Sequence, residues 1–207
     1  MSVPSLEAIT TGLIEQLQSE QKELRLLILR RVSQGGPVSK AQLASELHIS
    51  EDELEKRLHQ LPDTEYNENG DVVGWGVTLV PTRHHFQVNG KQLYTWCAFD
   101  TVLFPPCLGQ EAHVLSHCPT TGEPISFVAS PSGAIRDLSP TTSILALLIA
   151  FDQNRVRQTF CENALFFSSE RAATPYLATH PNAVLLSLEQ ASQVGQQVAA
   201  ACFGIKK

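Results

Sequence analysis

The sequence has no hydrophobic run long enough to cross a membrane. Its longest apolar run, from Ile144 to Phe151, is far shorter than the roughly 20 residues that a bilayer-spanning helix needs. The first 18 residues include Glu7 and Glu15 and lack both a basic n-region and a continuous apolar h-region, so they do not resemble a signal peptide. We therefore expect a cytoplasmic protein with no membrane partner.

The sequence also lacks an excess of positive charge. Lys and Arg total 15 against 21 Asp and Glu, which gives a formal net charge of −6. This balance argues against DNA, RNA or an acidic membrane surface as the main partner. Charged residues make up only 17% of the 207 residues and hydrophobic residues 43%, which is typical of a folded chain with one large or two small domains.

Cysteines are few, and their number is odd. A disulfide framework is not expected from an odd number of cysteines in a reducing compartment. Cys118 lies in a Cys-Pro-x-x-Gly turn that resembles half of a zinc knuckle, but no Cys-x-x-Cys pair or second knuckle is present, so we interpret it as a structural thiol. His84 and His85 are adjacent on an expected strand and would point to opposite faces, which disfavours a shared metal. The five cysteines are Cys97, Cys107, Cys118, Cys161 and Cys202.

The first third of the chain has the periodicity of helices. Apolar residues recur at helical spacing over Ser5–Gln18 and again over Gln21–Val32. Ser39 and Ser50 are good N-caps for two further short helices, the second with a capping-box glutamate and closed by Pro62.

A hairpin is expected over Thr64–Val80, where Asn69-Gly70 marks the turn. Four helices followed by a hairpin are typical of a winged helix-turn-helix. The expected recognition helix, Glu51–Gln60, has four acidic residues against two basic ones, and residues 1–86 carry 8 Lys and Arg against 13 Asp and Glu. Phosphates would repel such a helix, so we predict a packing module that does not read DNA.

The rest of the chain mixes strands and helices. His84–Val88 is expected to be a strand, and Lys91–Phe104 a helix closed by Pro105-Pro106. Short extended runs follow up to residue 138, Ser143–Phe151 fits either a buried strand or a buried helix, and Ser187–Ala201 is helical. We therefore predict an α+β fold, in which a helical winged-helix-like domain (1–80) packs on a domain of mostly antiparallel short strands flanked by helices (81–207).

Cys97 and Asp100 would share one face of a helix at positions i and i+3. A thiol and a carboxyl held side by side can exchange a proton, and the neighbouring Trp96 and Phe99 would raise the pKa of the carboxyl. On spacing alone, however, a buried core thiol next to a solvated carboxylate fits better, because free Cys is among the most buried residue types. Taken by itself, Cys161 indicates nothing.

Four motifs in this order are nevertheless specific, and together they resemble the alkylmercury lyase family of bacterial mercury resistance. The likeness extends from about Val38 to the last helix. The motifs are Tyr94-x-Trp-Cys97-Ala-x-Asp100, Thr64-Glu65-Tyr66 with Gly70, Gly74 and Gly76-Val77-Thr78-Leu79, Ser116-His117-Cys118-Pro119 with Gly122, and Val156-Arg157-Gln158-Thr159-Phe160-Cys161 with Phe166-Phe167.

The resemblance implies roles for individual residues. Cys97, Asp100 and Cys161 match the two cysteines and the aspartate of the family's active site, with Trp96 and Phe160 at the substrate pocket. In the family the cysteine that Cys118 matches is structural. Cys107 and Cys202 match no motif, and Glu162 stands where many members have a further cysteine.

The implied activity is protonolysis of the carbon–mercury bond of organomercurials, giving a hydrocarbon and Hg(II). Thiolate is the side-chain ligand that soft Hg(II) prefers, so Cys97 and Cys161 would bind the metal as substrate and product while Asp100 moves the proton. No organic cofactor is expected, and small thiols or a mercuric reductase would accept the Hg(II). Two alternatives remain: a thiol-based metal carrier, which would not need Asp100, and a metal-responsive winged-helix regulator, which the acidic recognition helix disfavours.

Overall fold

Two of the four N-terminal helices begin at the serine caps that the sequence predicts. A computed structural model describes residues 4–61 and 63–205. The side chains of Ser39 and Ser50 accept hydrogen bonds from the backbone N–H groups of Gln42 and Glu53, each at 3.2 Å. Pro62, the expected end of the fourth helix, lies outside the described residues. The four helices are α1 (Leu6–Leu17), α2 (Lys22–Val32), α3 (Lys40–Glu46) and α4 (Glu51–His59).

A large antiparallel sheet begins in the expected hairpin and continues through the second half of the chain. Its eight strands run in the order β1-β2-β3-β5-β4-β6-β7-β8, so the hairpin strands and the later strands share one sheet. The strands are β1 (Glu65–Tyr66), β2 (Val72–Trp75), β3 (Val77–Thr78), β4 (His84–Val88), β5 (Lys91–Thr95), β6 (Ala112–His117), β7 (Pro124–Ala129) and β8 (Ile135–Ser139).

The predicted helix over Lys91–Phe104 is wrong for residues 91–99 and right only for residues 100–104. Lys91–Thr95 is strand β5, which pairs with β3 and β4, and helix α5 covers Asp100–Leu108. Pro105 and Pro106 lie inside α5 and do not close it; the helix ends at Gly109, which has a left-handed φ of 65°. Every residue from Asp100 to Cys107 is buried, so packing stabilises this helix despite its two prolines.

A second sheet of three strands, in the order β10-β9-β11, lies beside helix α8. It settles the open interpretation of Ser143–Phe151, because Ile144–Leu148 is the central strand β9. The sequence did not predict β11. The remaining elements are α6 (Val156–Thr159) between short 3₁₀ turns at Gln153–Arg155 and Cys161–Asn163, β10 (Leu165–Phe167), α7 (Glu170–Thr179), β11 (Ala183–Ser187) and α8 (Leu188–Phe203).

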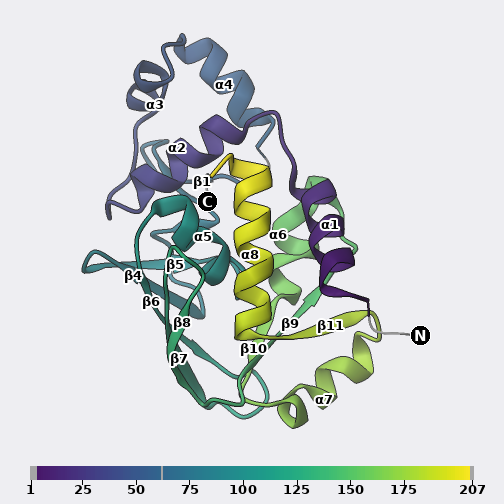
Figure 1. The fold of residues 1–207 in the computed structure, drawn as a ribbon. Coiled ribbons are helices and arrows are strands. Elements are labelled where there is room, and N and C mark those ends of the chain that lie inside the picture. Colours follow the sequence, from purple (N-terminus) through teal and green to yellow (C-terminus); the bar gives the residue numbers. More distant parts are fainter. Residues whose placement is uncertain (1–3, 62, 206–207) are drawn as a thin grey trace.

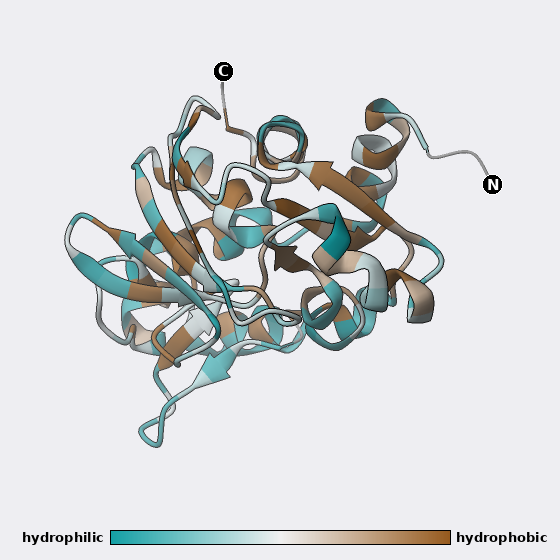
Figure 2. Ribbon diagram, turned by 90° about the horizontal axis from the view of Figure 1, so that it is seen from below, coloured by the Kyte–Doolittle hydropathy of each residue, from teal (hydrophilic) through white to brown (hydrophobic). Residues whose placement is uncertain are grey.

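Helix α8 runs through the middle of the molecule, with α5 on one side and α1 on the other (Figure 1). A Cβ atom on Gly195 would lie 2.9 Å from the backbone oxygen of Val102, so the close contact between α8 and α5 requires glycine. Hydrophobic stretches gather in the interior, whereas hairpin tips are hydrophilic (Figure 2). The expected α+β fold is confirmed. None of the helices in the described residues is long and apolar enough to cross a membrane.

Candidate active site

Three side chains from two distant segments meet in the interior. Cys97 follows β5, Asp100 is the first residue of α5, and Cys161 opens the 3₁₀ turn before β10. The two sulfur atoms and a carboxylate oxygen of Asp100 all lie within 4.8 Å of one another, and all three residues are buried. The structure therefore brings together the three residues that the resemblance singled out.

The geometry that joins Cys97 to Asp100 differs from the predicted helix face. Cys97 precedes α5, and its backbone N–H donates a 3.0 Å hydrogen bond to Oδ2 of Asp100. One residue further on, the N–H of Ala98 donates to the backbone oxygen of Ala164 at 3.1 Å. This bond ties the segment of Cys97 to the segment that follows Cys161.

Glu65, on the first hairpin strand, holds both halves of the site. Its carboxylate accepts a 3.1 Å hydrogen bond from the indole N–H of Trp96 and an ion pair from Arg157. The guanidinium of Arg157 also lies 5.1 Å from the centre of the Trp96 ring. The backbone N–H of Arg157 donates to Asp63 at 3.1 Å. Glu65 and Arg157 belong to two of the sequence motifs, but nothing in the sequence itself indicates their role.

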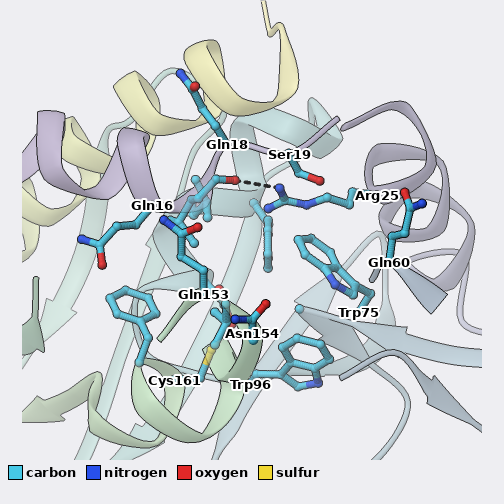
Figure 3. Close-up of a pocket in the computed structure, with 17 residues that line it drawn as sticks. Gln16, Gln18, Ser19, Arg25, Gln60, Trp75, Trp96, Gln153, Asn154 and Cys161 are labelled. Atoms are coloured by element: carbon cyan, nitrogen blue, oxygen red, sulfur yellow. Dashed lines mark hydrogen bonds between the residues drawn. The ribbon is translucent and has the colours of Figure 1, made fainter. Parts of the chain in front are cut away.

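A cavity of about 230 Å³ lies at the site (Figure 3). Cys161 and Asp100 line it, whereas Cys97 is fully buried and is not among the lining residues. A molecule that enters the cavity therefore meets the thiol of Cys161 first. The aromatic lining consists of Trp75, Trp96, Phe104 and Phe160, which includes both residues expected at a substrate pocket.

Burial favours the protonated forms of all three groups in the cluster. It raises the pKa of Asp100 from 3.8 to about 7, although hydrogen bonds from Cys97 and the charge of Arg25 work in the opposite direction. Burial also raises the pKa of the Cys97 thiol well above its usual value. A hydrogen bond from Cys97 favours the thiolate of Cys161, but burial and the charge of Asp100 outweigh it and raise the pKa of Cys161. Near neutral pH the carboxyl of Asp100 can both hold and release a proton.

The other three cysteines lie outside this cluster. Burial raises the pKa of the Cys107 thiol to about 12 and raises that of Cys202. Burial also opposes ionisation of Cys118 at the end of β6, but hydrogen bonds from Thr121, Ser168 and nearby backbone lower its pKa to about 7. All five cysteines are free thiols.

The histidines supply no second metal site within the described residues, where the group of Cys97, Asp100 and Cys161 is the only set of three close ligands. His84 is buried, its Nδ1 lies 2.9 Å from the hydroxyl of Ser116, and burial lowers its pKa to about 3. A neutral, hydrogen-bonded His84 fits a structural role in the core.

Two buried thiols and a carboxyl beside a cavity with an aromatic lining are a candidate site for a soft metal ion, which thiolate ligands suit. A family model described as alkylmercury lyase matches residues 77–200, and one described as the helix-turn-helix domain of alkylmercury lyase matches residues 10–76. The chain therefore belongs to the alkylmercury lyase family, and it is an organomercurial lyase. This confirms the resemblance found in the sequence.

Curated relatives support this family assignment, and a solved structure supports the fold. The chain is 38% identical over 173 residues to an alkylmercury lyase of Staphylococcus epidermidis, which covers 84% of this chain and 80% of that protein. It is 37% identical over 176 residues to an alkylmercury lyase of Pseudomonas putida, covering 85% and 82%. A crystal structure described as the mercury-bound form of MerB2 has the same fold, with a TM-score of 0.76, 22% identity, and coverage of 95% of this chain and 98% of that chain.

Proposed function

We propose that this lyase breaks the carbon–mercury bond by protonolysis, with Cys97 and Cys161 as mercury ligands and Asp100 as the proton carrier. The observation that supports this most directly is the buried group of two sulfurs and one carboxylate oxygen within 4.8 Å. One metal held by two thiolates at about 2.3–2.5 Å each, by analogy with zinc–thiolate bonds, needs sulfurs no more than about 5 Å apart. The spacing of Cys97 and Cys161 satisfies this limit.

The reaction can be written with all atoms accounted for. A substrate R–Hg–X, where X is a small thiolate, reacts with two cysteine thiols to give R–H, HX and Hg(II) bound to two cysteine sulfurs. Cys161, which lines the cavity, displaces X, and its proton leaves with X. Cys97 then binds mercury and gives its proton to the carboxylate of Asp100. When the carbon–mercury bond breaks, the electron pair goes to carbon, which takes the proton from Asp100.

Asp100 is suited to this task because its pKa of about 7 populates both protonation states near neutral pH. As a carboxylate it accepts the proton of Cys97, whose own pKa is too high for spontaneous ionisation. As an acid it protonates the departing carbon. No organic cofactor takes part in these steps.

Product release needs outside thiols. Hg(II) bound by two buried thiolates leaves only by ligand exchange, so we propose small thiols or a mercuric reductase as acceptors. A reducing compartment such as the cytoplasm would supply those thiols and keep the cysteines free.

The test is headspace detection of methane or benzene from methylmercury or phenylmercury with excess thiol. Cys97→Ser and Cys161→Ser should each abolish hydrocarbon formation, because each leaves one soft ligand. Asp100→Asn should retain Hg(II) through gel filtration but form hydrocarbon about 10²–10⁴-fold more slowly. If Asp100→Asn formed hydrocarbon at the wild-type rate, Asp100 would not be the proton donor. If this variant failed to retain Hg(II), Asp100 would instead be a ligand of the metal.

Membership of the alkylmercury lyase family argues against both alternatives, the metal carrier and the metal-responsive regulator, and each of them predicts a different experimental result. A metal carrier would hold Hg(II) but form no hydrocarbon even as the wild-type protein. A metal-responsive regulator would shift DNA in a gel at low salt. Helix α4 disfavours the regulator, because Arg57 pairs with Glu53 at 3.0 Å on the same helix, and Lys40 pairs with Glu55 at 2.7 Å.

A further inference from the structure

A buried arginine without a carboxylate partner lies in the wall of the cavity. Arg25, on α2, is 5% exposed, and it lines the same cavity as Asp100 and Cys161. Among the described residues, no carboxylate lies within ion-pair distance of its guanidinium. A buried charge is costly unless it is paired. The charge of Asp100 raises the pKa of Arg25, but only from beyond ion-pair distance, so within the described residues the guanidinium is left without a direct anionic partner.

The guanidinium of Arg25 is held in place by several contacts, but not all of its N–H groups have a hydrogen-bond partner. It lies 4.3 Å from the centre of the Trp75 ring and 4.8 Å from that of Phe203, and Nη1 donates a 2.7 Å hydrogen bond to the backbone oxygen of Leu17. Its Nε–H is buried and has no hydrogen-bond partner. Burial lowers the pKa of Arg25 to about 10, so the side chain remains a cation at neutral pH.

Polar groups lie beside this cation at the end of the cavity away from Cys161 (Figure 3). Ser19 and Gln60 both line the cavity next to Arg25. The Oε1 atom of Gln60 already accepts a 2.7 Å hydrogen bond from Gln21, which leaves its amide N–H groups to donate. A guanidinium, a hydroxyl and an amide together form a set of donors suited to a carboxylate.

The cavity is large enough to hold an aryl group between Cys161 at one end and Arg25 at the other. A protein cavity of about 150 Å³ is known to hold benzene, and this cavity measures about 230 Å³. Trp75 and Trp96 both line it and offer flat apolar surface. A benzoate-sized group would therefore fit with its ring against the indoles.

We propose that Arg25 is a specificity-determining residue that recognises organomercurials whose organic group bears a carboxylate, with mercury at Cys161 and the carboxylate at the guanidinium. This rests on the proposed function. The negative charge would provide the partner that Arg25 lacks within the described chain. Uncharged aryl groups would fit the same cavity without that interaction, so the proposal concerns preference among substrates.

The kinetic test compares 4-carboxyphenylmercury with 4-carbamoylphenylmercury, whose neutral amide has nearly the same size and shape as the carboxylate. In the wild-type protein, kcat/KM should favour the carboxylate by about 10–100-fold, the value of one hydrogen bond to a charged group. The ratio should fall to near one in Arg25→Gln and stay high in Arg25→Lys. Arg30→Gln is the matched control, because Arg30 is an exposed arginine on the same helix outside this cavity, and it should keep the wild-type ratio. A ratio near one in the wild-type protein, or an unchanged ratio in Arg25→Gln, overturns the proposal.

A binding measurement needs neither turnover nor a variant. The two tryptophans of the chain both line the cavity, so their fluorescence reports on small aromatic ligands. Benzoate should change the fluorescence of the wild-type protein at a concentration about tenfold lower than benzamide. Equal fluorescence responses to benzoate and benzamide would mean that the cavity does not prefer an anion. This result would overturn the proposal even if Arg25→Gln does not fold. Failure of the proposed function appears differently, as the absence of hydrocarbon from every organomercurial.

Discussion

Replacing Asp100 by Asn should change how the stability of the protein depends on pH. In the folded state the pKa of Asp100 is about 7, against 3.8 for the free side chain. A carboxyl with a raised folded-state pKa contributes fully to stability below pH 3.8, and this contribution is lost as the pH rises to about 7. Asn carries no charge at any pH, so Asp100→Asn removes this loss. Its side-chain oxygen can still accept the hydrogen bond from the N–H of Cys97.

The magnitude follows from the two pKa values. The rise from 3.8 to about 7 corresponds to roughly 4 kcal/mol over the whole pH range of the transition. Between pH 5 and pH 8, where unfolding is practical to measure, roughly 2–3 kcal/mol remains. Wild type should therefore lose that much stability relative to Asp100→Asn over these three pH units. The change with pH is the quantity to compare, since the amide also alters local hydrogen bonding by a constant amount.

The assay is urea unfolding of both proteins at several pH values, with a phosphine reductant to keep the thiols free. Asp137→Asn is the matched control, because Asp137 is an exposed carboxylate on β8 with a left-handed φ of 54°, a conformation that Asn tolerates. Parallel stability curves for wild type and Asp100→Asn would mean that Asp100 ionises normally in the folded protein. That result would refute its assignment as a proton donor near neutral pH.

The other expected outcomes concern residues around the site. Cys107→Ser and Cys202→Ser should leave hydrocarbon formation within about twofold of wild type, since neither thiol lies in the cluster of Cys97, Asp100 and Cys161. Cys118→Ser should lower the melting temperature and soluble yield while the folded fraction keeps its specific activity; a folded but inactive variant would contradict its structural role. Glu65→Gln should reduce kcat/KM about tenfold, because it weakens the ion pair with Arg157, and unchanged kinetics would show that this contact does not position the site.

Local features of the chain predicted the helical N-terminal third well. Ser39 and Ser50 cap α3 and α4 through bonds that span three residues, so the information lies within a few neighbouring positions. Strand β5 was mistaken for a helix because its extended conformation depends on pairing with β3 and β4, and the residues of the segment alone do not reveal this pairing. Helix α5 forms despite its two prolines in a segment whose residues from Asp100 to Cys107 are all buried, and that burial comes from the packed fold and not from the local sequence.

The site could be predicted only in part. Spacing alone favoured an inert Cys97, and the cluster with Cys161 was expected only because of the family motifs. Glu65 and Arg25 could not be found from sequence, because their importance comes from contacts with residues far along the chain. Glu65 reaches Trp96, and Arg25 stacks on Trp75 inside the cavity.

The distance along the chain between the two proposed mercury ligands has a consequence for the protein with Hg(II) bound. Cys97 and Cys161 are 64 positions apart in the sequence, so one metal bound to both closes a large loop in the way a disulfide does, but without oxidation. For a loop of this length, the chain-entropy model of a cross-link gives a stabilisation of about 4 kcal/mol. Product-loaded protein should thus resist unfolding far better than empty protein. Exchange with thiols, which replaces one sulfur–metal bond at a time, reopens the loop while the rest of the chain stays folded.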